Sequence, residues 1–172
     1  MKKLIALFAA IVLVSGLTST VNAQTQGVSA TATGSATIIT PLSITKNVDM
    51  NFGAIAVNAN AGTVVLSPLS VRTPSGGVTL PTSAIAVSSA AFAVTGLNSA
   101  TYAITLPSTA LTLTSGSNNM SVNAFTLSAG AGTLSATGTQ TINVGATLSV
   151  GASQAAGSYV SATPFTVTVN YN

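Results

Sequence analysis

The chain has 172 residues, of which 47% are hydrophobic and 3% are charged, and its formal net charge is +3. It contains no His or Cys, and Asp49 is its one acidic residue. This composition excludes a Ser-His-Asp triad, hydrolysis by paired carboxylates and a zinc site with nitrogen or sulfur ligands within one chain. We therefore expect no enzyme activity and no cofactor, and too few basic residues to bind nucleic acid.

The N-terminus predicts export. Lys2 and Lys3 precede an apolar run over residues 4–17, and the small-residue site Val21-Asn22-Ala23 follows it. This order is typical of a signal peptide over residues 1–23, and the run is short for a membrane span. We expect a secreted protein that passes through the periplasm to the cell surface or medium, with no membrane segment after cleavage; an uncleaved anchor is the alternative.

The predicted mature chain has 149 residues (172 minus 23), which suits one domain. Without cysteine, its core and hydrogen-bond ladders must hold the fold unaided. So few charges leave almost no electrostatic barrier to self-association, which favours a subunit that assembles.

Residues 24–38 form a predicted N-terminal extension ahead of a domain over residues 39–172. From residue 28 to 38, small or apolar residues alternate with Ser and Thr, which is the period of a half-buried strand. The strand is expected either to pair within its own sheet or to enter a neighbouring subunit. Its predicted inward residues are Val28, Ala30, Ala32, Gly34, Ala36 and Ile38.

Short alternating segments continue along the chain. Residues 58–62 and 74–77 are predicted turns, the second being a hairpin turn, and residues 63–66 a short strand. The alternation changes phase near Ser88-Ser89 and again between residues 122 and 125, where we expect a bulge or a change of strand.

The last two predicted strands are the longest. Ile142 to Val150 alternates throughout, and a turn over residues 151–157 leads to a closing strand. The apolar residues of that strand are Phe165, Val167, Val169 and Tyr171. No segment shows a helical period, so the sequence predicts an all-β, antiparallel β-sandwich, with a barrel or solenoid as the alternative.

Two local features have competing interpretations. Asn47, Asp49 and Asn51 alternate as in a calcium loop, but a single negative charge favours a polar connection between strands. Arg72 either contacts a partner or is a solvated or sheet-edge arginine.

The chain resembles the secreted bacterial family called domain of unknown function 4402 over nearly its whole mature length. The resemblance rests on T-A-T-G-S-A-T-I-I-T-P-L-S-I-T-K, N-F-G-A-I, G-T-V-V-L, R-T-P-S-G-G-V, A-A-F-A-V-T-G, Y-A-I-T-L-P, V-G-A-T-L-S-V-G and F-T-V-T-V-N-Y-N. The family name implies no function.

The two ends also resemble pilins of chaperone-usher fimbriae, including the archaic, spore-coat-U-like group. Those pilins are immunoglobulin-like sandwiches that lack a final strand, which a chaperone supplies first and the N-terminal strand of the next subunit then replaces. By this resemblance residues 28–38, with Gly34 in phase, are similar to the donated strand. Residues 165–171, with Tyr171 penultimate and Gly157 before them, are similar to the closing strand.

The resemblance implies a fimbria-like polymer joined by donated strands, with a periplasmic chaperone and an outer-membrane usher as possible partners. The alternative is a monomeric, secreted or cell-surface binding module, such as an adhesin or a glycan-binding sandwich, whose N-terminal strand pairs in its own sheet.

Overall fold

A computed structural model describes residues 27–172, so the predicted signal peptide lies outside the described residues. These residues divide between Thr37 and Ile38 into two units. In the first unit, residues 27–37 carry no strand and every side chain is exposed. The alternation of this segment is therefore present in the sequence without forming a strand in the single chain.

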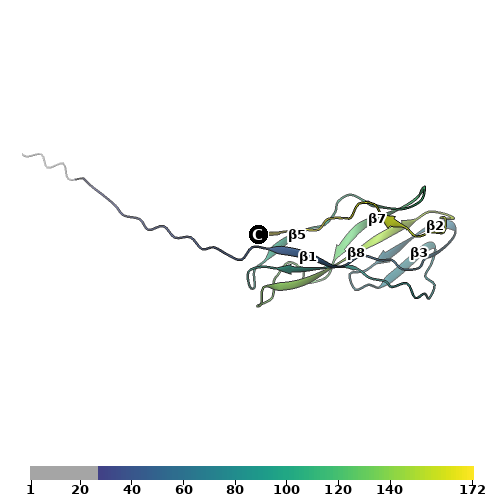
Figure 1. Ribbon diagram of the computed structural model, residues 1–172, viewed down its shortest axis with the longest axis horizontal. Helices are drawn as coiled ribbons and strands as arrows, with labels where there is room; N and C mark the ends of the chain where they lie inside the picture. The colour runs from purple at the N-terminus through teal and green to yellow at the C-terminus, as the bar shows by residue number, and fades with distance from the viewer. Residues whose placement is uncertain (1–26) are drawn as a thin grey trace, which may run out of the picture. The chain divides into compact units, whose positions relative to one another are not determined.

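The second unit is an antiparallel β-sandwich (Figure 1), which confirms the predicted fold class. One sheet has eight strands and follows the path β1-β4-β8-β7-β6-β9, with β2 paired to both β8 and β3. A second sheet contains β5 and β10. The strands are β1 (Ser43–Val48), β2 (Ala56–Leu66), β3 (Arg72–Thr79), β4 (Ala90–Thr95), β5 (Tyr102–Thr105), β6 (Leu111–Ser115), β7 (Asn118–Leu127), β8 (Thr139–Val150), β9 (Val160–Ser161) and β10 (Thr168–Tyr171).

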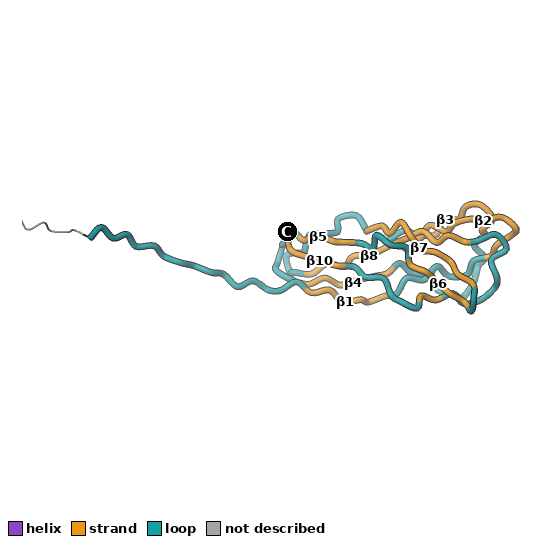
Figure 2. Tube along the Cα trace, turned by 90° about the horizontal axis from the view of Figure 1, so that it is seen from above, coloured by secondary structure: helices purple, strands orange, loops and turns teal. Residues whose placement is uncertain are grey.

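Strand β8 is the centre of the larger sheet. Its first half pairs with β4 and its second half with β2, while β7 pairs along the opposite edge. As a result β1 and β4 lie toward one end of the domain, and β2 and β3 toward the other (Figure 2). The sheet curls because one long strand serves two different neighbours on the same side.

The core has two hydrophobic clusters, one in each half of the sandwich. The first lies beside β2 and β7, and its buried residues are Phe52, Val64, Leu66, Val78, Val122, Ala146, Leu148 and Val150. The second lies between β4, β8 and the β5-β10 sheet, and its buried residues are Ala90, Val94, Tyr102, Leu134, Ile142, Val144 and Val167.

Two of the predicted turns are wrong. Residues 58–62 lie within β2. The hairpin turn predicted at residues 74–77 is wrong as well. Those residues belong to β3, where Ser75 pairs with Thr63 of β2. The chain turns instead at residues 67–71, where Ser70 has φ 60° and donates its backbone N–H to Ser67 O at 2.9 Å. The Gly-rich stretch serves close strand pairing, because a Cβ at Gly62 would collide with the backbone of β3.

Both phase shifts mark real irregularities. The register between β7 and β8 slips between Asn123 and Thr126, and Ala124 has φ 47°, which confirms a bulge. At the first shift, Ser88 bridges to Asn51 just before β4 begins at Ala90, so the chain changes partner there.

Candidate functional site

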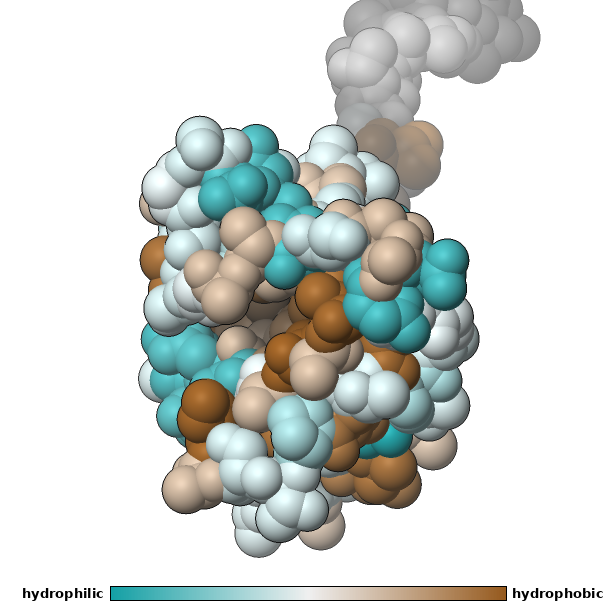
Figure 3. All heavy atoms as spheres, turned by 90° about the vertical axis from the view of Figure 1, so that its right-hand side faces the viewer, coloured by the Kyte–Doolittle hydropathy of each residue, from teal (hydrophilic) through white to brown (hydrophobic). Residues whose placement is uncertain are grey.

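An open groove of about 980 Å³ runs along the half of the sandwich that contains β2 and β7. Two segments contribute much of the groove lining, one within residues 46–57 and one within residues 154–165. We call these the first wall and the second wall. Inward side chains of four strands form the floor, namely Phe92, Leu111, Leu113, Met120, Val122 and Leu148. Seen from the end of the domain, the surface is hollowed and hydrophobic side chains gather at the hollow (Figure 3).

The groove lies between two of the edge strands of the curled sheet, β1 and β9. The strand path starts at β1 and ends at β9, and both strands contribute residues to the groove lining. At the other end of the domain, β1 approaches β10, which narrows the gap. Edge strands present unpaired backbone N–H and C=O groups, so a gap between two edges offers hydrogen bonds on both sides.

Apolar side chains stand open to water at this gap. Val48, at the end of β1, is 42% exposed, and Val160, in β9, is 62% exposed. Both line the groove. Covering such side chains with an apolar partner is favourable, at about 25 cal/mol for each Å² removed from water.

Arg72 holds part of the first wall from outside. Its Nη1 donates to Phe52 O and to Ala54 O, each at 2.7 Å, and the residue is half-buried. Since β3 pairs with β2 alone, Arg72 is a sheet-edge arginine, but its guanidinium is engaged with the backbone.

The acidic residue of the chain does not gather ligands. Asp49 forms an exposed salt bridge with Lys46, with Nζ to Oδ1 at 2.7 Å. The Asn51 amide oxygen accepts from the Gly53 backbone N–H at 2.8 Å. These contacts support a polar connection between strands over a calcium loop.

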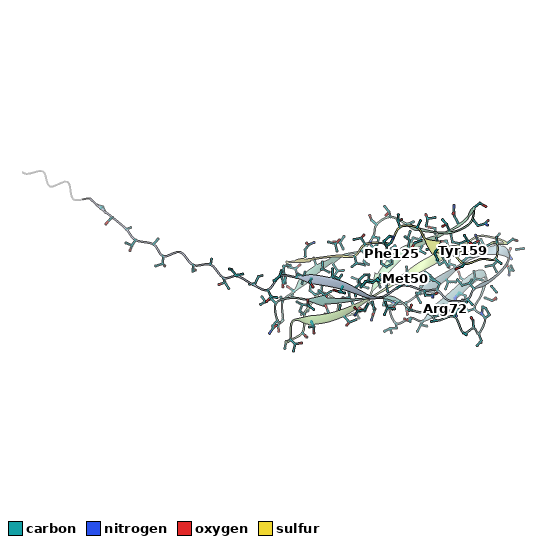
Figure 4. The ribbon with its side chains drawn as sticks, in the orientation of Figure 1. Met50, Arg72, Phe125 and Tyr159 are labelled. Carbon is teal, nitrogen blue, oxygen red and sulfur yellow. The ribbon has the colours of Figure 1, made fainter. Side chains whose placement is uncertain are left out.

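The second wall has its own hydrogen-bond network. Gln154 Nε2 donates to Tyr159 Oη at 2.8 Å, and the Tyr159 hydroxyl donates to Ala155 O at 2.8 Å. Gln154 also donates to Asn119 O at 3.3 Å, which ties the wall to β7. Figure 4 labels Met50 and Tyr159, which line the groove from the two walls, and Phe125 of β7, which packs like Met50 against the first core cluster.

The residues predicted for the closing strand divide between the groove and the second core cluster. Phe165 lines the groove and packs against Phe125, with ring centroids 5.1 Å apart. Val167 is buried, and Val169 and Tyr171 pair with β5. Strand β10 is therefore shorter than the predicted strand.

Tyr171 fixes the end of the domain from which the N-terminal extension departs. Its hydroxyl donates to Thr40 O at 2.8 Å and accepts from the Leu97 N–H at 2.7 Å. The predicted donor segment, residues 28–38, precedes Thr40 in the chain. The residues at its two ends, Val28 and Ile38, are 100% and 98% exposed.

The sequence did not reveal the first wall as part of a site. In the sequence, N-F-G-A-I stands out only as a family motif, and its apolar residues lie between two strands without belonging to either. One feature of the sequence could have indicated this wall: the chain contains both that motif and the motif R-T-P-S-G-G-V, which holds its one arginine, Arg72.

By its fold and its groove, the protein is classified as an antiparallel β-sandwich with an open gap between edge strands of its sheet. Within residues 27–172 we find no helix with the length and apolarity required to cross a membrane.

The chain belongs to the family described as Domain of unknown function (DUF4402), whose model matches residues 42–171. The matched span contains all ten strands and confirms the family resemblance. No curated protein and no solved structure matches the chain.

Proposed function

We propose that the protein is a structural subunit of an extracellular, fimbria-like polymer, without enzyme activity. In this proposal the domain is an immunoglobulin-like, pilin-like sandwich, and residues 28–38 of one subunit enter the groove of the next. A periplasmic chaperone fills the groove before assembly, and an outer-membrane usher guides export.

The groove between the two sheet edges is the observation that carries this proposal. A strand placed there gains backbone partners on β1 and β9 and covers Val48 and Val160. Residues 28–38 suit this position because their small and apolar residues all fall on one phase. With Gly34 and three alanines on that phase, the strand is thin enough to lie over a filled floor.

The positions of the two ends favour an open chain of subunits. The start of β1 and the C-terminus lie at the left-hand end of the domain in Figure 1, and the hollow of Figure 3 is at the right-hand end. A segment that leaves one end and enters the opposite end of a neighbour makes a head-to-tail contact, which propagates into a filament unless rotation closes it.

The decisive experiment uses paired cysteines in a chain that has none of its own. In the double variant Ala36→Cys with Val160→Cys, donation gives disulfide-linked ladders on a non-reducing gel. Self-pairing gives a cross-linked monomer instead. The matched control pairs Thr37→Cys with Val160→Cys, because Thr37 lies on the opposite phase and should not cross-link.

Two further double variants combine Val160→Cys with Ala30→Cys or with Ala32→Cys, so that other registers of the inserted strand are tested. Ladders from any of these positions, with none from Thr37, support donation. Cross-linked monomers, or no cross-link at any of the three positions, overturn it. A full mature chain that stays monomeric and binds a glycan saturably would favour the binding-module alternative.

A further inference from the structure

We infer that Arg72 is a positioning residue that shapes the first wall of the groove so that a strand can bind there. This inference rests on the proposed function, because it assigns a role in strand binding to a residue that no inserted strand needs to touch. It is carried by the hydrogen bonds of residues 52–55.

The wall lacks a neighbouring strand at these residues. Asn51 bridges to Ser88 on one side of the stretch, and Ala56 pairs with Thr79 on the other. Between them, the hydrogen bonds found within residues 27–172 hold the backbone only through side chains. Arg72 donates hydrogen bonds to the carbonyl oxygens of Phe52 and Ala54, and the Asn51 side-chain oxygen accepts a hydrogen bond from the N–H of Gly53.

Arg72 thus supplies hydrogen bonds that a neighbouring strand would otherwise supply. One guanidinium nitrogen satisfies two carbonyls that lie 20 and 18 residues away along the chain. A polar group that is buried without a hydrogen-bond partner costs free energy. Without Arg72, the wall would therefore shift until these two carbonyls bond to water or to another donor. With them satisfied from outside, the wall keeps its position beside the groove.

Gly53 shows how closely the wall fits against this support. Its φ is 68°, and a Cβ there would lie 2.7 Å from Val87 Cγ2 and 3.1 Å from Arg72 Nη1. A side chain at residue 53 would therefore push the wall away from Arg72, which gives a way to test the contact without changing the arginine.

The experiment measures the polymerisation rate of the full mature chain and its backbone amide hydrogen exchange. We expect Arg72→Gln to slow polymerisation about tenfold, because a shorter, neutral side chain replaces the guanidinium that donates to both carbonyls. Ser75→Ala is the control on the same strand, since it removes an exposed side-chain hydrogen bond outside the groove lining and should leave the rate unchanged. Arg72→Lys should restore part of the rate, because it keeps the charge and a donor.

A second pair of variants covers the case in which Arg72→Gln fails to fold. Gly53→Ala should also slow polymerisation, whereas Gly116→Ala should not. Both glycines have positive φ, but a Cβ at Gly116 meets no heavy atom within 4 Å. The two substitutions therefore share the backbone strain, but only Gly53→Ala lies in the wall and adds a Cβ that would collide with Val87 and Arg72.

Hydrogen exchange distinguishes positioning from general destabilisation. In Arg72→Gln, faster exchange confined to residues 52–57 supports the inference, and equally faster exchange in β8 overturns it. If Arg72→Gln and Gly53→Ala polymerise like their controls, the inference fails and the proposed function stands. If the unsubstituted chain does not polymerise, the proposed function fails, and the exchange pattern alone still decides whether Arg72 orders the wall.

Discussion

The two halves of the sandwich share strand β8 but differ in how their cores are covered. Around Ile142, the β5-β10 sheet and Leu134 close the core on the side opposite β4 and β8. Around Leu148, the corresponding side is the groove, where Met50 and Met120 are only partly buried. One half is thus complete within a single chain, and the other has room for an additional segment.

Under the proposed function, this difference places stability in the closed half and assembly in the open half. The closed half can hold the fold while the open half remains available to a partner. Substitutions in the closed half should therefore act mainly on unfolding, and those in the open half should act on unfolding less strongly.

The largest expected effect compares two core residues on β8. Ile142 is 0% exposed in the closed half, and Leu148 is 1% exposed but lines the groove. We expect Ile142→Ala to lower the free energy of unfolding by about 2–5 kcal/mol, with Leu148→Ala toward the lower end of that range. The groove already provides open space beside Leu148, so the substitution creates less new cavity.

Denaturant unfolding of the chain with the strand-blocking substitution Ile38→Asp measures both costs in the monomer. Equal losses for Ile142→Ala and Leu148→Ala would show that the two halves are packed alike. If the protein polymerises as proposed, the cost of Leu148→Ala in the polymer should rise toward that of Ile142→Ala, because the proposed inserted strand would cover Leu148.

The next largest effect compares two tyrosines that each use the hydroxyl for two hydrogen bonds. Tyr171 joins Thr40 and Leu97 at the closed end, and Tyr159 joins Gln154 and Ala155 on the second wall. We expect Tyr171→Phe to lower the free energy of unfolding by about 1–3 kcal/mol, counting two hydrogen bonds. Tyr159→Phe should cost less, because its wall borders the open groove. Thermal unfolding of both variants tests this order, and the reverse order would contradict it.

The smallest effect is a pH dependence of the closed half. Tyr102 is 3% exposed, its hydroxyl donates to Gln140 Oε1 at 2.5 Å, and burial raises its pKa above the ordinary value of 10.0, against a smaller opposing effect of a backbone hydrogen bond with Gly132. The unfolded chain therefore loses this proton first as the pH rises. The stabilisation is fully present below pH 10.0 and is lost as the pH rises from there through the pKa of the folded protein.

Tyr102→Phe should reduce this alkaline loss, measured as unfolding midpoints below and above pH 10.0. The same unfolding midpoints measured on Tyr159→Phe, a variant in the open half, provide the comparison. An unchanged alkaline loss in Tyr102→Phe would mean that other groups cause it.

Much of the fold was predictable from local patterns. The alternation in β8 predicts a buried face, and the phase change between residues 122 and 125 predicts a bulge that the structure contains at Ala124. The hairpin turn was mispredicted because glycine serves both turns and close strand contacts, and only the partner strand shows which role Gly62 and Gly76 have.

The candidate site was predictable only in part. Residues 28–38 stand out by their period, and Phe165 lines the groove. The first wall and its support by Arg72 depend on contacts between segments about 20 residues apart, which no local pattern encodes.

The sequence by itself determined an all-β chain with few charges, short alternating strands and a thin N-terminal segment, because periodicity and composition are local properties. Tertiary structure alone decided that the curled sheet stops short of closing and that its two edges face each other across an apolar groove. The physical reason is that strand pairing and burial are long-range: β8 can change neighbours halfway along its length, and only the folded chain shows which edge is left without one.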